Sequence, residues 1–167
     1  MRLCIFFSAL LLVYSCSEER KSDLPSSDGL PDQESWGVTI IMTHEGLIRA
    51  KVNSRHLKKF NEKEYIILDE NVVVDFFDLQ ENHTSTLFSD KSEINEKSND
   101  MLAIGNVIAK SDSGITLFTE RLQWIAEDEK LFTKDSIMIT TLDKDTLFGK
   151  GFESNADLEN WRIVNPS

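Results

Sequence analysis

A unit of 30 residues recurs through the second half of the sequence and limits the folds open to the chain. The triplet Thr-Leu-Phe begins at Thr86, Thr116 and Thr146, so the same interval occurs twice. Apolar positions around the triplet keep this interval, and the matching sets are Val72, Leu102 and Phe132, then Phe77, Val107 and Ile137, then Leu79, Ala109 and Ile139. Such a period indicates a repeated supersecondary unit that buries its apolar face only against its neighbours.

The repeated units are predicted to consist of β-strands. From Trp36 onward the sequence alternates between polar and apolar residues, and long helical periodicity is missing. The β-branched or aromatic runs lie at 65–68, 72–79, 101–109, 115–119 and 137–141, and polar clusters such as Asp69-Glu70-Asn71 separate them. Short strands with turns at this spacing are typical of a sandwich, a barrel or a repetitive β architecture.

Each repeat carries a change of phase in its alternation. In the second copy the apolar residues are Leu102 and Ile104 and then, across Gly105-Asn106, Val107 and Ala109. In the first copy they are Val72, Val74 and Phe76 and then Phe77 and Leu79. One extra residue that exchanges the two faces is a β-bulge, and bulges bend strands. We therefore predict an all-β fold of bent antiparallel strands in a curled sheet, with an apolar interior groove; a flat sandwich is the alternative.

The N-terminal segment has the features of an exported lipoprotein. The apolar run at 3–13 is too short to span roughly 30 Å of hydrocarbon but suits the core of a signal peptide. Val13-Tyr14-Ser15-Cys16 resembles a bacterial lipobox, which predicts cleavage before Cys16 and lipidation of its thiol, including palmitate. An ordinary secretory signal with an incidental cysteine is the alternative.

These features predict three parts. Residues 1–15 are the signal peptide, and residues 16–35 are the lipidated cysteine and a polar, disordered tether. Residues 36–167 are the folded β domain.

Composition and motifs exclude several classes of function. With 18 basic against 29 acidic residues, the net charge of −11 argues against nucleic-acid binding. The cysteines are Cys4 and Cys16, so the folded part has no disulfide framework and no cysteine-based zinc site. His44, His56 and His83 lack metal-ligand spacing, and no nucleophile elbow, P-loop or dinucleotide fingerprint occurs. We expect no catalytic residues, no cofactor and no metal.

The C-terminal half resembles the LptC family of lipopolysaccharide-export proteins. The likeness rests on the segments 113–124 and 145–155, and on the ending Leu158-x-x-Trp161-x-Ile163. Its most specific part is the sequence Gly149-x-Gly151-Phe-x-Ser, and the likeness extends over roughly residues 36–164. The resemblance implies an OstA-like β-jellyroll.

The resemblance also implies a non-catalytic lipid relay on the periplasmic side of the cell envelope. Family members accept lipopolysaccharide from the membrane subunits LptF and LptG, which work with the ATPase LptB, and pass it along an apolar groove to an LptA-like bridge protein. Contacts at the two ends of the jellyroll join strand to strand. The best-studied members have a transmembrane helix where this chain has a lipobox, so we expect a lipid anchor, in the inner membrane. The alternatives are a bridge or outer-membrane jellyroll of the same pathway, although the lipobox argues against a soluble bridge, a structural or other ligand-binding jellyroll lipoprotein, and a lipoprotein hydrolase.

A groove for acyl chains needs only buried apolar area, at about 0.8 kcal/mol for each methylene. The residues expected to face the interior and bind lipid are Val74, Phe76, Ile104, Val107, Leu117, Ile137, Ile139 and Leu147. The alternative is that they form an ordinary core.

The basic side chains in residues 46–60 suggest either a contact with lipid phosphates or a solvated strand face; they are Arg49, Lys51, Arg55, His56, Lys58 and Lys59.

Overall fold

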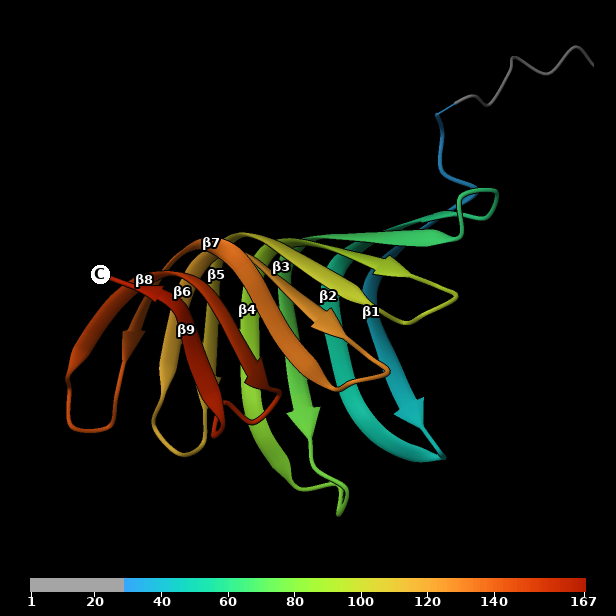
Figure 1. The fold of residues 1–167 in the computed structure, drawn as a ribbon. Helices are drawn as coiled ribbons and strands as arrows, with labels where there is room; N and C mark the ends of the chain where they lie inside the picture. The colour runs from blue at the N-terminus through green and yellow to red at the C-terminus, as the bar shows by residue number, and fades with distance from the viewer. Residues whose placement is uncertain (1–28) are drawn as a thin grey trace, which may run out of the picture.

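The computed structural model describes residues 29–167, and within them the chain forms nine strands in one sheet (Figure 1). The strands are β1 (Gln33–His44), β2 (Leu47–Phe60), β3 (Tyr65–Phe77), β4 (His83–Asn95), β5 (Met101–Ser111), β6 (Thr116–Ile125), β7 (Lys130–Thr140), β8 (Thr146–Asn155) and β9 (Trp161–Pro166). Each strand pairs antiparallel with the next one in sequence, so β1 and β9 are the free edges. The all-β prediction is confirmed.

The predicted signal peptide and Cys16, with most of the tether, lie outside the described residues. Strand β1 begins at Gln33, ahead of the domain boundary predicted at Trp36, because Gln33 and Glu34 pair with Lys59 and Lys58 of β2. Among residues 29–167, no helix is long and apolar enough to cross a membrane.

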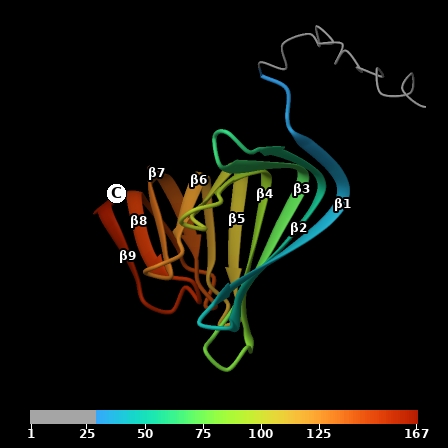
Figure 2. The ribbon, with the colours of Figure 1, turned by 90° about the vertical axis from the view of Figure 1, so that its right-hand side faces the viewer.

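Strands β2 to β8 bend near their middle, where the pairing register shifts. The sheet therefore curls over, and the two halves of each strand lie in two layers that face each other (Figures 1 and 2). Contacts between strands that are far apart in the sheet follow from this: Phe76 of β3 packs edge-on against Trp124 of β6, with ring centroids 5.4 Å apart. The predicted turn at 69–71 is one of these bends, so the runs 65–68 and 72–79 belong to the single strand β3.

The predicted change of phase is wrong for β3 and β5. Buried residues in β5 are Met101, Ala103, Val107 and Ala109, so Leu102 and Ile104 lie on the opposite, outer side and are half-buried. The bend of β5 holds two residues with positive φ, Gly105 at 81° and Asn106 at 47°. Two residues inserted into the alternation leave the same face of the strand buried, whereas one inserted residue would turn the following side chains to the opposite face.

The reversal of faces occurs instead in the intervening strands. In β6 the buried residues are Leu117 and then Leu122 and Trp124, and in β4 they are Leu87 and Ser89 and then Ser92 and Ile94. The sequence thus located the irregularity of β5 correctly at Gly105-Asn106, but it wrongly predicted that this irregularity reverses the buried face.

The repeated Thr-Leu-Phe triplet builds one apolar row on each side of the sheet. Its leucines belong to an interior row of directly paired residues that runs from β2 to β8: Val52, Val74, Leu87, Ala109, Leu117, Ile139 and Leu147. Its phenylalanines belong to a matching outer row, which consists of Val73, Phe88, Ile108, Phe118, Met138 and Phe148. The repeat therefore specifies both the pairing of the strands and the position of the interior.

The Gly-x-Gly motif of β8 allows the last strand to close the stack. A Cβ atom on Gly149 would lie 2.3 Å from Cγ2 of Ile163 and 2.9 Å from the carbonyl oxygen of Asn165, both in β9. Gly151 has a φ of 81°, a conformation that side chains with a Cβ rarely adopt. Ile163 thus fills the interior space that a side chain at position 149 would otherwise occupy.

We expect Gly149→Val to lower the free energy of unfolding by about 1–3 kcal/mol, because the new side chain must displace Ile163 and overpack the end of the interior. Lys150→Val, at the adjacent exposed position, is the control and should change stability little. Denaturant unfolding of the two variants measures the difference. Equal losses would contradict the role given to Gly149.

Candidate functional site

The structure brings six of the eight residues predicted to bind lipid into one buried cluster. They are 0–4% exposed: Val74, Phe76, Val107, Leu117, Ile137 and Ile139. They come from β3, β5, β6 and β7, which shows that the interior is shared by the repeats. Whether lipid contacts them remains a prediction.

The other two predicted residues are not enclosed. Ile104 lies on the outer side of β5, as described above. Leu147 faces the interior side, opposite Ile139, but is 39% exposed because the pairing of β9 with β8 stops at Gly149 and leaves position 147 uncovered. Leu147 therefore lies at the margin of the interior.

Sequence reasoning missed two residues that close the interior. Trp124 at the end of β6 is buried against Phe76, and its indole Nε1 has no hydrogen-bond partner among the described residues. Leu158 in the turn between β8 and β9 is fully buried, with a φ of 61°. A single leucine within the polar segment Asn155–Asn160 was the available signal.

The interior is filled in its middle and less so toward its ends. Val38, Ile40 and Ile66 at the β1 end are only partly buried, as are Trp161 and Ile163 at the β9 end. A cavity of about 320 Å³ lies at the β1 end, and four isoleucines line it together with Met42, Thr43, Glu96 and Asn99. An apolar interior whose side chains are partly exposed at its two ends suits a chain-like apolar ligand better than a compact polar one.

Most of the basic run in β2 is engaged in ion pairs with other parts of the domain. Arg49 pairs with Glu129, Lys58 with Asp69, and Lys59 with Glu96. Lys51 and Arg55 are exposed. The run therefore serves mainly to connect strands and offers few free charges to an anionic ligand.

His56 connects the edge strand β1 to its neighbours. Its Nδ1 lies 2.7 Å from Asp69 Oδ1, its Nε2 lies 3.5 Å from Glu34 Oε1, and Trp36 stacks on its ring at 5.1 Å. Ligand atoms of His56, Asp69 and Glu70 also lie within 4.8 Å of one another, which the sequence spacing did not indicate. Because the imidazole already contacts two carboxylates and an indole, its evident role is structural.

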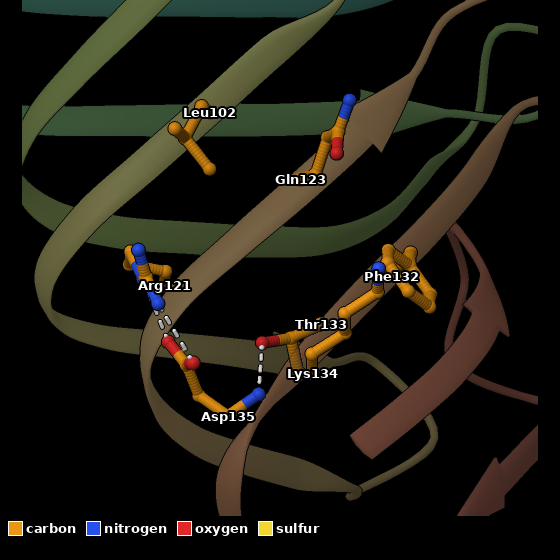
Figure 3. A pocket seen from close by; sticks show the side chains of 7 residues that line it. All are labelled: Leu102, Arg121, Gln123, Phe132, Thr133, Lys134 and Asp135. Carbon is orange, nitrogen blue, oxygen red and sulfur yellow. Dashed lines mark hydrogen bonds and ion pairs between the residues drawn. The ribbon is translucent and has the colours of Figure 1, made fainter. Parts of the chain in front are cut away.

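A cleft of about 240 Å³ lies on the outer side of β5, β6 and β7 and is separate from the interior (Figure 3). Figure 3 shows Arg121 and Asp135 pointing toward each other, with Arg121 Nε and Nη2 donating to the two carboxylate oxygens at 2.8 and 2.9 Å. The Asp135 backbone N–H donates to Thr133 Oγ1 at 3.1 Å. Asp135 already accepts hydrogen bonds from both Nε and Nη2 of Arg121, so this cleft is a weak candidate for a ligand site.

The Arg121–Asp135 pair predicts a pH dependence. The hydrogen bonds from Arg121 hold the pKa of Asp135 below its ordinary value, partly opposed by burial. A lowered folded pKa stabilises the fold above the unfolded pKa of about 3.9, and this contribution disappears as the pH falls through the folded pKa. Wild type should therefore have a higher Tm than Asp135→Asn at pH 7, and the difference should shrink toward pH 2. Asp143→Asn, in an exposed turn, is the control. A difference in Tm between wild type and Asp135→Asn that does not depend on pH would contradict the stabilising role given to the Arg121–Asp135 pair.

Comparisons with known proteins agree with this geometry. The family model described as lipopolysaccharide-assembly, LptC-related, matches residues 2–165. No curated protein matches the chain. The chain is similar to the crystal structure of LptH, the LptA homologous periplasmic component of the conserved lipopolysaccharide transport device from Pseudomonas aeruginosa. That match has a TM-score of 0.55 and 9% identity, and it covers 70% of this chain and 82% of the other. At this identity the match establishes the jellyroll fold.

Proposed function

The chain belongs to the LptC-related family of lipopolysaccharide-assembly proteins, and we propose that it carries lipopolysaccharide through its interior from a membrane complex to a periplasmic bridge protein. Family membership makes it a periplasmic component of lipopolysaccharide transport and not an enzyme. The path of the cargo, the partners at each end and the anchor belong to the proposal.

The interior apolar row is the observation that carries this proposal. It passes through seven consecutive strands without a charged residue, from Val52 to Leu147. Each methylene of an acyl chain that contacts such a row contributes about 0.8 kcal/mol. Because the row is closed in its middle, bound acyl chains must separate the two layers and replace contacts that the layers now make with each other.

The partners are proposed to bind at the two free edges. LptF and LptG, with the ATPase LptB, would supply lipopolysaccharide at the β1 end, and an LptA-like bridge would receive it at the β9 end. Both β1 and β9 are unpaired on their outer side within residues 29–167, as strand addition requires. This direction also follows from an anchor at Cys16, which precedes β1 and would hold that end nearer to the membrane.

The anchor is proposed to be lipid on Cys16, with residues 1–15 removed, residues 16–35 as a tether and the inner membrane as its location. The lipobox Val13–Cys16 supports it. Labelling of cells with a palmitate analogue should mark the wild-type protein and not Cys16→Ala. A protein that keeps residues 1–15 and takes up no label would contradict the proposed lipid anchor, but it would leave the proposal about the cargo unchanged.

Photo-crosslinking in cells tests the cargo. A small diazirine analogue of leucine at position 117, 139 or 66 should form adducts with lipopolysaccharide, because these positions face the interior or its β1 end. The control position is Thr140, whose side chain points to the opposite side of β7 from Ile139. Adducts at Thr140 alone, or at none of the four positions in a folded and exported protein, would contradict the proposal.

One observation favours a second candidate function. Leu87, Leu117 and Ile139 are fully buried, as in an ordinary core. A structural or other ligand-binding jellyroll lipoprotein of the cell envelope would have such an interior, and it would give no lipopolysaccharide adduct in the same experiment.

A further inference from the structure

One partly buried ion pair joins the two layers across the open side of the sheet. The turns that follow β1, β3, β5 and β7 form one rim of this opening, and those that follow β2, β4, β6 and β8 form the other; we refer to the opening as the mouth. Arg49 lies near the first rim, in β2, and Glu129 lies on the second, in the turn before β7. Arg49 Nε and Nη2 donate to Glu129 Oε1 and Oε2 at 2.5 Å each, between residues 80 positions apart.

A β-bulge directs Arg49 into the mouth. Met42 and Thr43 of β1 pair with Ala50 and Ile48 of β2, so Arg49 between them has no partner in β1. An extra residue of this kind points its side chain away from the regular alternation. Arg49 is consequently buried beside Ala50, although consecutive residues of a regular strand would face opposite sides.

The two partners differ in how easily they can separate. The side chain of Arg49 is 8% exposed, and its Nη1 has no hydrogen-bond partner among the described residues. The side chain of Glu129 is 30% exposed, and its backbone is held at a φ of 52°, which residues other than glycine rarely adopt. Glu129 can therefore move into water, whereas Arg49 remains in the mouth and is fully hydrated only if the layers part.

Cavities lie on both sides of the pair. One of about 150 Å³ has Arg49, Met42 and Trp124 among its lining residues. The other, of about 320 Å³, has Arg49 together with Asp78, Asp128, Glu129 and Asp157 in its lining, and Arg49 is its one basic residue within the described part of the chain. Arg49 thus offsets carboxylates that come from both rims and would otherwise repel one another.

We propose that Arg49 and Glu129 form a latch that holds the mouth closed and controls lateral access of acyl chains to the interior. This inference rests on the proposed function, since it takes the cargo to be lipid. The latch is the side-chain link between β2 and the β6–β7 turn. Arg49 lines one cavity together with Trp124, and Trp124 packs on Phe76 in the closed part of the interior. Opening it separates the layers at the position where acyl chains must replace core contacts.

Two substitutions should open the latch to different extents. Arg49→Met keeps the length and apolar stem of the side chain but leaves the cavity lined by Asp78, Asp128 and Asp157 without a cation, so the rims repel. Glu129→Gln keeps one hydrogen-bond acceptor and removes one acid, so the rims separate less. Arg121→Met is the matched control, since it removes a bidentate arginine–carboxylate pair from the outer side of the sheet.

Hydrogen exchange of the full-length protein is the first measurement, because it does not depend on lipid. Amides in the turns at 126–129 and 156–160 should exchange at least several-fold faster in Arg49→Met than in wild type, and to a smaller degree in Glu129→Gln. The bend amides of β3, β5 and β7 should keep their rates, which separates an opened mouth from general unfolding. Unchanged exchange at both turns, or equal acceleration in Arg121→Met, would overturn the latch.

Lipid capture is the second measurement and separates the two proposals. At short irradiation times, the yield of lipopolysaccharide adducts at position 139 should rise several-fold in Arg49→Met and not in Arg121→Met. A lower yield in a folded variant would overturn the latch and give Arg49 a direct part in holding the cargo. Faster exchange at the mouth with no adduct in any variant would uphold the latch and overturn lipopolysaccharide as the cargo.

Discussion

Replacing Phe76 with alanine is expected to lower the free energy of unfolding by about 3–5 kcal/mol. Phe76 is 1% exposed and contacts Trp124 across the two layers, so its removal eliminates apolar contacts on both sides and leaves a cavity. The lost aromatic pair contributes about 0.5–1.5 kcal/mol of this effect. Denaturant unfolding, with the m-value of each variant compared with wild type, measures the change.

Phe148→Ala is the matched control for this prediction. Phe148 is 54% exposed in the outer row, so its truncation removes the same atoms without opening a cavity, and the change should stay within about 0.5 kcal/mol. If Phe76→Ala does not fold, Phe76→Leu should fold and be destabilised by a smaller amount. Similar costs for the two alanine variants would show that the layers are not packed against each other.

Val164→Pro is expected to reduce binding of the proposed bridge protein about ten-fold or more while leaving β9 in place. Ser167 N–H donates to the carbonyl of Phe148, so in the antiparallel pairing of β8 and β9 the backbone groups of residues 163 and 165 point toward β8. Those of Val164 then point toward the free edge. Proline at 164 removes an outward N–H and places its ring against an incoming strand, without loss of a hydrogen bond to β8.

In-cell crosslinking between this protein and the bridge measures that effect. Val164→Thr keeps the N–H and a β-branched side chain and should bind as wild type does. Ile163→Pro should instead detach β9 and destabilise the domain, since the N–H of residue 163 points toward β8. Undiminished binding in a folded Val164→Pro protein would mean that the bridge does not add a strand at the β9 edge.

The candidate interior was predictable because two signals in the sequence agree. The 30-residue repeat aligned the leucines at 87, 117 and 147, and the pairing of strands indeed joins these positions in one row. Period-two alternation then identified the buried face in most strands. The prediction failed at Leu102 and Ile104. The number of residues in the bend of β5 determines which face of the sheet these side chains take, and the polar segment Gly105-Asn106 does not reveal that number.

The turn at 69–71 illustrates a second limit. A polar cluster between two apolar runs has the composition of a connection between strands, and Glu70 and Asn71 do adopt left-handed backbone conformations. In the folded protein the chain continues in the same strand after them, because β2 and β4 pair with β3 on both sides of the bend. Local composition specifies a change of direction but not whether the same neighbours continue beyond it.

The sequence by itself determined the strand period, the repeated unit and the apolar character of the interior, since these follow from the spacing of residue types along one strand. Only the tertiary structure decided how far the interior is closed and what closes it. The link between Arg49 and Glu129, the packing of Phe76 on Trp124 and the place of Ile163 over Gly149 all join residues whose strands meet only when the sheet curls over. Each of these contacts depends on the path of the bent strands in three dimensions, and the order of residues within a single strand does not reveal that path.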